Sequence, residues 1–204
     1  MRKYLTFVFV VLFGNFVFAD SPLTSTAIYK AYLDVPMVAK VSKSNGILND
    51  EVFDYLNSNL NSLDKKIAVI NALKWNVRGK KNAAYYLKKI YAIHKDYTNK
   101  NFYSKGSAQE LILYAYLKSL DNYFDVKKAL VFSNRAVKLN PKSYTLSIIN
   151  KLIKAQTIPH HEWCEIYQLM NKIRGNKKIV FDLRKEAVNI IFKYTDGYKT
   201  YCSN

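Results

Sequence analysis

Apolar residues recur every three or four positions along most of the chain, and polar residues fill the positions between them. This spacing matches the 3.6-residue turn of an α-helix, so each such segment has one apolar face. Only four prolines and six glycines interrupt the 204 residues, and they fall mainly between these segments. The pattern predicts an all-α protein with about nine or ten helices.

Several helix starts are marked by side chains that can cap a first turn. Asn49 and Ser62 each precede a segment with the helical period, and Ser107 with Glu110 three residues later has the pattern of a capping box. The segment from Asp96 to Gly106 is polar and lacks the helical period. It is predicted to be the longest loop of the protein.

The first nineteen residues have the pattern of a secretory signal peptide. Arg2 and Lys3 precede the apolar run Leu5 to Phe18, and the small residue Ala19 follows it. The run is shorter than the roughly 20 residues that cross a bilayer, so a retained membrane anchor is the weaker alternative. We predict cleavage after residue 19, a mature chain that starts at Asp20 and has no membrane span, and a periplasmic or extracellular location.

The protein is strongly basic, with 32 Lys and Arg residues against 15 Asp and Glu residues. Arg2 and Lys3 are the only charged residues among the first nineteen, so the mature chain keeps a net charge of +15. This charge attracts acidic proteins, anionic membrane surfaces and nucleic acids alike. Because an exported protein rarely meets nucleic acid, nucleic acid is not the expected partner. A protein or peptide is expected, and the charge leaves open whether it is acidic.

Basic residues and tyrosines alternate between residues 80 and 105. Lys81, Lys88 and Lys95 fall on the face of a predicted helix opposite its apolar stripe. Lysines attract phosphates and other anions, and tyrosines offer stacking surfaces, so these three lysines are candidates for binding a polyanion such as nucleic acid, a polysaccharide or anionic lipid. The alternative is an ordinary solvated helix face.

The two cysteines, Cys164 and Cys202, both lie in the predicted mature chain, 38 residues apart. Export would place them where a disulfide persists. By loop-closure arithmetic such a bond would contribute roughly 4 kcal/mol and hold the predicted C-terminal tail, residues 194–204. The alternative is a buried Cys164 with a free Cys202 on a frayed end.

Metal-capable residues cluster only near residue 160. In a helix, His160 and Cys164 would share one face and His161 would lie on another, so no face gathers three ligands. Pro159 at the start of this segment is typical of a helix N-terminus. The sequence therefore predicts neither a metal site nor a cofactor.

The sequence also lacks the common catalytic motifs. It contains no Gly-x-Ser-x-Gly element and no glycine-rich phosphate loop, and its 15 acidic residues are scattered or lie in the first turns of helices. These features predict a protein that is not an enzyme. An all-α hydrolase or lyase whose site is assembled from residues distant in sequence stays open as an alternative.

Residues 111–141 carry a further pattern. Ala129 and Ala136 stand seven residues apart, and Pro141 follows five residues later. This segment resembles a tetratricopeptide repeat, a 34-residue helix-turn-helix unit in which small residues let paired helices approach and a proline follows the second helix. The likeness is clear only over this segment.

Two positions depart from the family's pattern, because Ser133 stands where the repeat has an aromatic residue and Leu117 where it has a small one. We therefore expect helix spacing that differs from the standard unit. The expected architecture is a single domain over residues 20–204, with antiparallel helical hairpins stacked as an irregular superhelix or bundle.

The resemblance implies a non-catalytic module that binds a protein or peptide on its concave face. First helices of the repeats would line that face. On this basis Tyr114, Lys118 and Tyr123 are the candidate contact residues.

Overall fold

The computed structural model describes residues 21–159, 161–176 and 178–202. Over these ranges it contains eleven α-helices and two 3₁₀ helices, and its only β-structure is an isolated bridge between residues 143 and 180. The all-α prediction is therefore confirmed. The predicted signal peptide, residues 1–19, lies outside the described residues.

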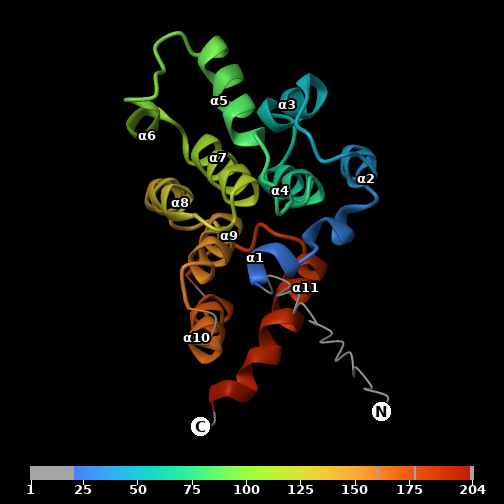
Figure 1. The fold of residues 1–204 in the computed structure, drawn as a ribbon, viewed down its shortest axis with the longest axis vertical. Coiled ribbons are helices and arrows are strands. Elements are labelled where there is room, and N and C mark those ends of the chain that lie inside the picture. The colour runs from blue at the N-terminus through green and yellow to red at the C-terminus, as the bar shows by residue number, and fades with distance from the viewer. Residues whose placement is uncertain (1–20, 160, 177, 203–204) are drawn as a thin grey trace, which may run out of the picture.

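The helices follow one another through mostly short connections (Figure 1). In chain order they are α1 (Pro22–Ser25), the 3₁₀ helix η1 (Ile28–Tyr32), α2 (Pro36–Ser42), α3 (Asp50–Asn57), α4 (Leu63–Ala72), α5 (Asn82–Ile93), α6 (Phe102–Lys105), α7 (Ala108–Asp121), α8 (Lys127–Leu139), α9 (Tyr144–Ala155), α10 (Trp163–Arg174), α11 (Lys185–Asp196) and the 3₁₀ helix η2 (Gly197–Cys202).

The central helices are α4, α7 and α9. Helix α7 packs against α4, α5, α8 and α9, and the consecutive helices α8, α9 and α10 also pack against one another. Helices α3 and α5 lie at one end of the molecule, and α10 and α11 lie at the opposite end (Figure 1). The main hydrophobic core runs through the middle of this arrangement and includes residues from α2 to α11.

Two predicted helix caps are confirmed. The Asn49 side chain accepts a hydrogen bond from the Val52 N–H at 3.0 Å at the start of α3. Ser107 and Glu110 form the reciprocal capping box at the start of α7. Such caps satisfy backbone N–H groups that have no partner within the helix.

The predicted loop between residues 96 and 106 is not entirely irregular, because it contains α6. Phe102 in α6 is only 1% exposed and packs against the rings of Tyr91, Tyr114 and Phe132, with centroids 5.7 to 6.0 Å apart. This aromatic anchor holds the segment against α7 and α8. A single buried aromatic residue leaves no periodic pattern, so the sequence did not indicate it.

Two buried asparagines attach the N-terminal segments to α4 and α5. The Asn71 side chain in α4 accepts a hydrogen bond from the Tyr29 N–H at 3.0 Å. The Asn82 side chain in α5 accepts from the Leu48 N–H at 2.9 Å and donates to the Gly46 carbonyl at 3.0 Å. An amide can both donate and accept, so it can pair with backbone groups that no helix satisfies.

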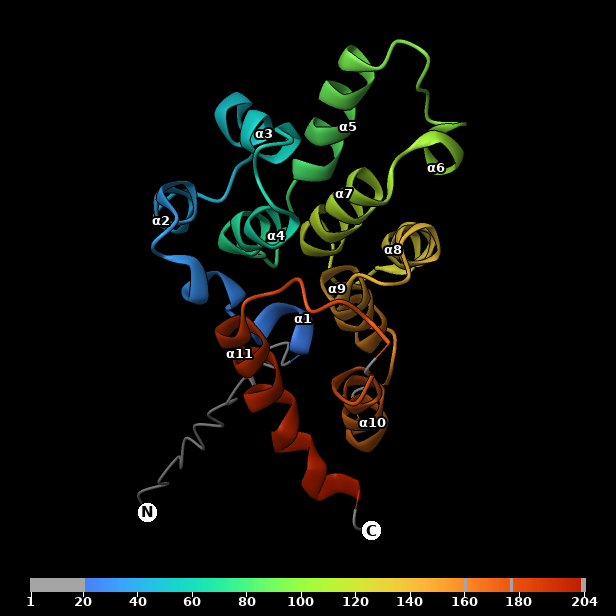
Figure 2. The same ribbon diagram turned by 180° about the vertical axis from the view of Figure 1, so that it is seen from behind.

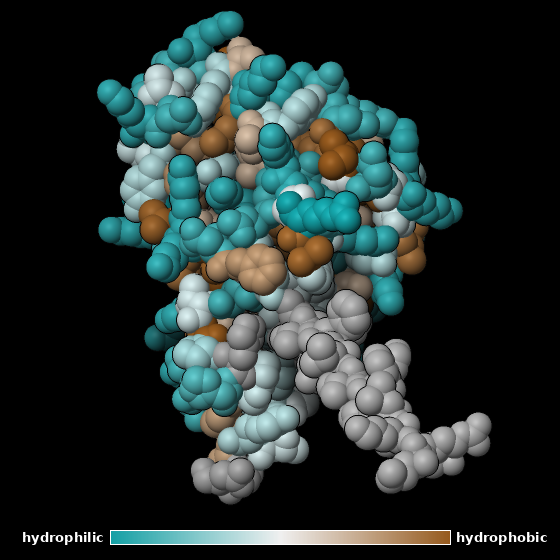
Figure 3. Space-filling model, viewed as in Figure 1, coloured by the Kyte–Doolittle hydropathy of each residue, from teal (hydrophilic) through white to brown (hydrophobic). Residues whose placement is uncertain are grey.

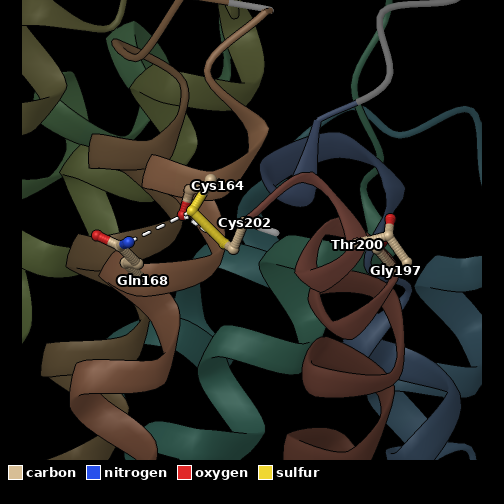
Figure 4. Close-up of a disulfide and its surroundings, with 5 residues drawn as sticks. All are labelled: Cys164, Gln168, Gly197, Thr200 and Cys202. Atoms are coloured by element: carbon tan, nitrogen blue, oxygen red, sulfur yellow. Dashed lines mark hydrogen bonds between the residues drawn. A yellow bond between two sulfur atoms is a disulfide. The ribbon is translucent and has the colours of Figure 1, made fainter. Parts of the chain in front are cut away.

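The C-terminal residues form structure instead of the predicted tail. Residues 194–196 belong to α11, residues 197–202 form η2, and a disulfide joins Cys164 in α10 to Cys202 (Figure 4). Tyr198 is buried in a second, smaller hydrophobic cluster, with Ile166 and Leu169 of α10. The alternative of a free Cys202 is therefore wrong for this structure, because the Cα atoms of the two cysteines lie 4.8 Å apart and their sulfur atoms are bonded.

No helix within the described ranges is both long and apolar enough to cross a membrane.

Candidate functional site

A hollow of about 650 Å³ opens between α10, α11 and the segment 178–184 that leads into α11. We call this hollow the groove and residues 178–184 the connecting segment. Tyr144, the first residue of α9, also contributes to the groove wall. Figure 2 shows the connecting segment crossing the end of α9 before it reaches α11.

The connecting segment is held against the start of α9 by backbone and side-chain hydrogen bonds. The Val180 carbonyl accepts from the Tyr144 N–H at 3.1 Å, and the Val180 N–H donates to the Lys142 carbonyl at 2.6 Å. The Asp182 carboxylate accepts from the Thr145 N–H at 2.7 Å. A carboxylate at this position satisfies a free N–H, and its negative charge is stabilised by the positive end of the helix dipole.

The other end of the connecting segment is held by Arg184. Its guanidinium donates to the Asp34 carboxylate, lies 4.3 Å from the ring centroid of Tyr32, and donates to the Ala31 carbonyl at 2.9 Å. The hydrogen bond from Arg184 lowers the pKa of Asp34 below its ordinary value of 3.8. With both ends attached, this wall of the groove has a defined position.

The floor of the groove is apolar. Val188 and Phe192 of α11, together with Tyr144, are mostly buried beneath it. Burial raises the pKa of Tyr144 to about 12, so its hydroxyl is neutral at physiological pH. Phe181, whose ring centroid lies 4.9 Å from that of Tyr144, stays 55% exposed at the edge, and its neighbour Val180 is 60% exposed. Two adjacent large apolar residues left open beside a hollow are typical of a binding surface.

Basic side chains line the rim. Arg174 pairs with the carboxylate of Asp196 and lies 4.0 Å from the ring centroid of Phe192. Lys185 and Lys193 of α11 are exposed, and neither forms an ion pair or a side-chain hydrogen bond with any described residue. Their positive charges are therefore available to an anionic group that enters the groove.

The predicted contact residues in and after α7 do not form an accessible surface. Tyr114 is 3% exposed and packs edge-on against the ring of Phe132, and Tyr123 is 5% exposed and packs against the ring of Trp75. Lys118 alone is partly exposed. Helices pack around α7 on several sides, which removes the open face that a repeat's first helix would present at Tyr114. Tyr123 lies beyond the end of α7, in the turn before α8, and is covered there.

The three lysines proposed for polyanion binding lie at the other end of the molecule from the groove. Lys81, Lys88 and Lys95, on or beside α5, are all exposed, and none forms an ion pair within the described part of the chain. On the face shown in Figure 3, hydrophilic side chains predominate, with scattered hydrophobic ones among them. The lysines have the arrangement of a solvated helix face, and they remain accessible to an anion.

No cluster of three metal-capable side chains is present in residues 21–159, 161–176 and 178–202, and His160 lies outside these ranges. In the disulfide region, the Gln168 side chain donates to Cys164 Sγ at 3.3 Å (Figure 4). Both cysteines are thus committed to a structural bond.

No protein family model, curated protein or solved structure matches this chain. The sequence pattern did not indicate the groove, because its residues come from α9, α10, α11, the connecting segment and Asn176, which are distant in sequence. The apolar run Ile179-Val180-Phe181 immediately before a helix start is the one signal that could have pointed to it.

Proposed function

We propose that this protein is an exported, non-catalytic module that binds a protein or peptide, and that the groove is its contact surface. The observation that carries the proposal is the combination of an apolar floor with two unpaired lysines around a hollow of about 650 Å³. Apolar area supplies affinity, and fixed charges at the rim select the partner and its orientation.

The packing around α8 supports a helical-repeat character for this module. Ala129 and Ala136 are fully buried, as small residues are where paired helices approach closely. Helix α8 ends at Leu139, two residues before Pro141. We propose that the α7–α8 pair is a tetratricopeptide-like hairpin within an irregular helical array.

The disulfide supports the proposed export. A bond between Cys164 and Cys202 persists in an oxidising compartment and is uncommon in the cytosol. Together with the signal-peptide pattern, it favours a periplasmic or extracellular site of action.

A second candidate function is binding of an anionic polymer or surface through α5. The exposed and unpaired state of Lys81, Lys88 and Lys95 favours it. Because α5 lies at the opposite end of the molecule from α10 and α11 (Figure 1), charge reversal at each site tests the two functions separately.

The test compares two double variants of the mature chain from Asp20. Lys185→Glu with Lys193→Glu alters the groove, and Lys81→Glu with Lys88→Glu makes the same change in net charge on α5. Each protein, immobilised, is used to capture proteins from the exported fraction, and bound proteins are identified by mass. Circular dichroism and thermal melting establish that both variants fold.

We expect a specific partner whose capture falls by roughly tenfold with the groove variant and is retained by the α5 variant. The three proteins are also applied to a heparin column. Partner capture that is unchanged in the groove variant, with heparin retention lost only in the α5 variant, would support the polyanion function instead. Equal capture by all three proteins would contradict the groove as the contact surface.

A further inference from the structure

We infer that the groove binds an extended, acidic peptide segment of a partner protein, and that this segment pairs as an added β-strand with residues 179–181. The inference rests on the proposed function and deepens it, because it states the conformation and the chemistry of the bound segment. Three features of the connecting segment and of α11 carry it.

The first feature is a free backbone edge. Val180 directs both its N–H and its C=O toward residues 142 and 144 in the isolated parallel bridge. The segment is not a regular strand, because Ile179 lies in a bend and Val180 forms only an isolated bridge, so an incoming chain would have to complete the strand here. No hydrogen bond within the described residues engages the N–H or C=O of Ile179 or Phe181. Backbone groups left without a partner beside a bridge residue can serve as a template for another chain.

The second feature is the direction of the side chains. Alternate residues of a strand face opposite sides, and residues paired in a bridge face the same side. Accordingly Tyr144, Ile179 and Phe181 line the groove, whereas Ser143 and Val180 do not. A strand added beside residues 179–181 would therefore direct every second side chain toward the groove.

The third feature is the spacing of the free charges. Lys185 and Lys193 are eight residues apart on α11, which corresponds to about 12 Å along a helix axis. In an extended peptide, side chains four residues apart lie on one face about 13 Å from each other. Two acidic residues at this separation, with an apolar residue midway, match the two lysines and the apolar floor between them. The expected segment is acidic-x-apolar-x-acidic.

The chemistry of the edge favours a peptide over other anions. Free N–H and C=O groups alternate along it, and a peptide backbone supplies the complementary acceptors and donors. A phosphate chain or a lipid headgroup offers acceptors alone, which would leave the carbonyls unpaired. The groove therefore selects a polypeptide among the partners that a basic protein attracts.

The probe is a fluorescein-labelled, amidated heptapeptide of sequence Ser-Asp-Ser-Phe-Ser-Asp-Ser, and binding to the mature protein is followed by fluorescence anisotropy. A peptide this short should bind with Kd on the order of 100 µM. Replacing both aspartates by lysines should weaken binding by about tenfold or more, because the rim is positive.

Backbone N-methylation of the probe tests the strand pairing directly. One analogue is methylated on the Asp and Phe amides, and the other on the Ser amides of the intervening positions. In a strand only alternate amides point to the neighbouring chain, so one analogue should lose binding by about tenfold and the other should keep it. Equal binding by the two analogues would overturn strand addition.

Two variants at one position provide the matching test on the protein. Phe181→Pro removes the free N–H at the edge, whereas Phe181→Leu keeps it and preserves an apolar side chain. We expect the proline variant to lose the probe and the leucine variant to stay within about threefold of the wild type. Hydrogen exchange on the wild type gives a readout independent of the variants, because the probe should slow exchange of the Ile179 and Phe181 amides.

The outcomes distinguish this inference from the proposed function. If the probe fails to bind, but the groove variant Lys185→Glu with Lys193→Glu loses a protein that the wild type captures, the peptide inference is overturned and the function stands. If the probe fails and the groove variant captures the same proteins as the wild type, both are overturned. Loss of probe binding only in the α5 variant would place the peptide site elsewhere and overturn the inference.

Discussion

The α7–α8 pair and the α10–α11 pair are held in place by different means. Ten of the fourteen residues of α7 are buried, so apolar packing fixes it on nearly every side. Helix α10 buries only four of its twelve residues, and its ends depend on the disulfide and on contacts with neighbouring segments. The region with less apolar packing is also the region that leaves the groove open.

This difference separates a helix that is buried on most sides from a pair of helices that leaves a hollow open between them. A helix packed on all sides contributes stability and offers no accessible side chains, as Tyr114 shows. Helices α10 and α11 are joined by the disulfide to η2 and by the ion pair between Arg174 and Asp196, and the connecting segment is attached to α9. Helices fixed at their ends in this way can keep apolar side chains beside solvent.

Removal of the disulfide should produce the largest change. Cys164→Ser with Cys202→Ser opens a loop closed across 38 residues, which loop-closure arithmetic values at about 4 kcal/mol. Chemical denaturation followed by circular dichroism should show an early transition of the C-terminal region, and trypsin should cleave after Lys199 before the rest of the chain. Unchanged unfolding and unchanged cleavage would show that packing of Tyr198 alone holds η2.

Enlarging a small residue in the closely packed pair should have an intermediate effect. Ala136→Leu adds volume at a fully buried position of α8, and overpacking of this kind costs about 1–3 kcal/mol in the free energy of unfolding. The control is Val131→Leu on the same helix, because Val131 is 51% exposed and should change stability by less than about 0.5 kcal/mol. Equal effects of the two substitutions would contradict close packing of α8.

The ion pair between Asp34 and Arg184 should give the smallest effect, and one that depends on pH. Arg184 lowers the pKa of Asp34 below 3.8, so the folded protein binds the proton less tightly than the unfolded chain does. The stabilisation is therefore present above the unfolded pKa and is lost as the pH falls through the folded pKa. Both side chains are partly exposed, so the effect is small.

The measurement is the difference in Tm between the wild type and Asp34→Asn from pH 7 down to pH 2.5. We expect a constant positive difference above about pH 5 that closes below the ordinary carboxyl pKa near 4. Asp54→Asn is the control, because Asp54 is exposed and its side chain forms no hydrogen bond within the described residues. A difference that does not vary with pH would mean that Asp34 acts through packing and not through its charge.

The helical class and the capping residues could be predicted from the sequence because they depend on neighbours in the chain. Asn49 and Ser107 cap helices that begin one residue later, and the helical period is likewise local. The cysteine pair could also be predicted, because a chain with two cysteines allows only one intramolecular disulfide.

The groove could not be predicted because distant residues create it. The Asp182 carboxylate accepts a hydrogen bond from the Thr145 N–H, 37 residues away in sequence, and the Arg184 guanidinium donates to the Asp34 carboxylate, 150 residues away. The burial of Tyr114, predicted to be a contact residue, has a related cause. An apolar stripe identifies one buried face, but it does not reveal that further helices cover the remaining faces of α7.

One polar contact between α8 and α9 limits how this array can change. The Asn150 amide donates to the Ser133 hydroxyl at 2.9 Å and to the Asn134 side chain at 2.7 Å, at the position where a tetratricopeptide repeat carries an aromatic residue. Sliding α9 by one turn, or inserting a copied hairpin beside α8, would leave this buried amide without partners. The protein is therefore expected to resist lengthening by duplication of its own units, unlike a regular solenoid in which every junction is equivalent.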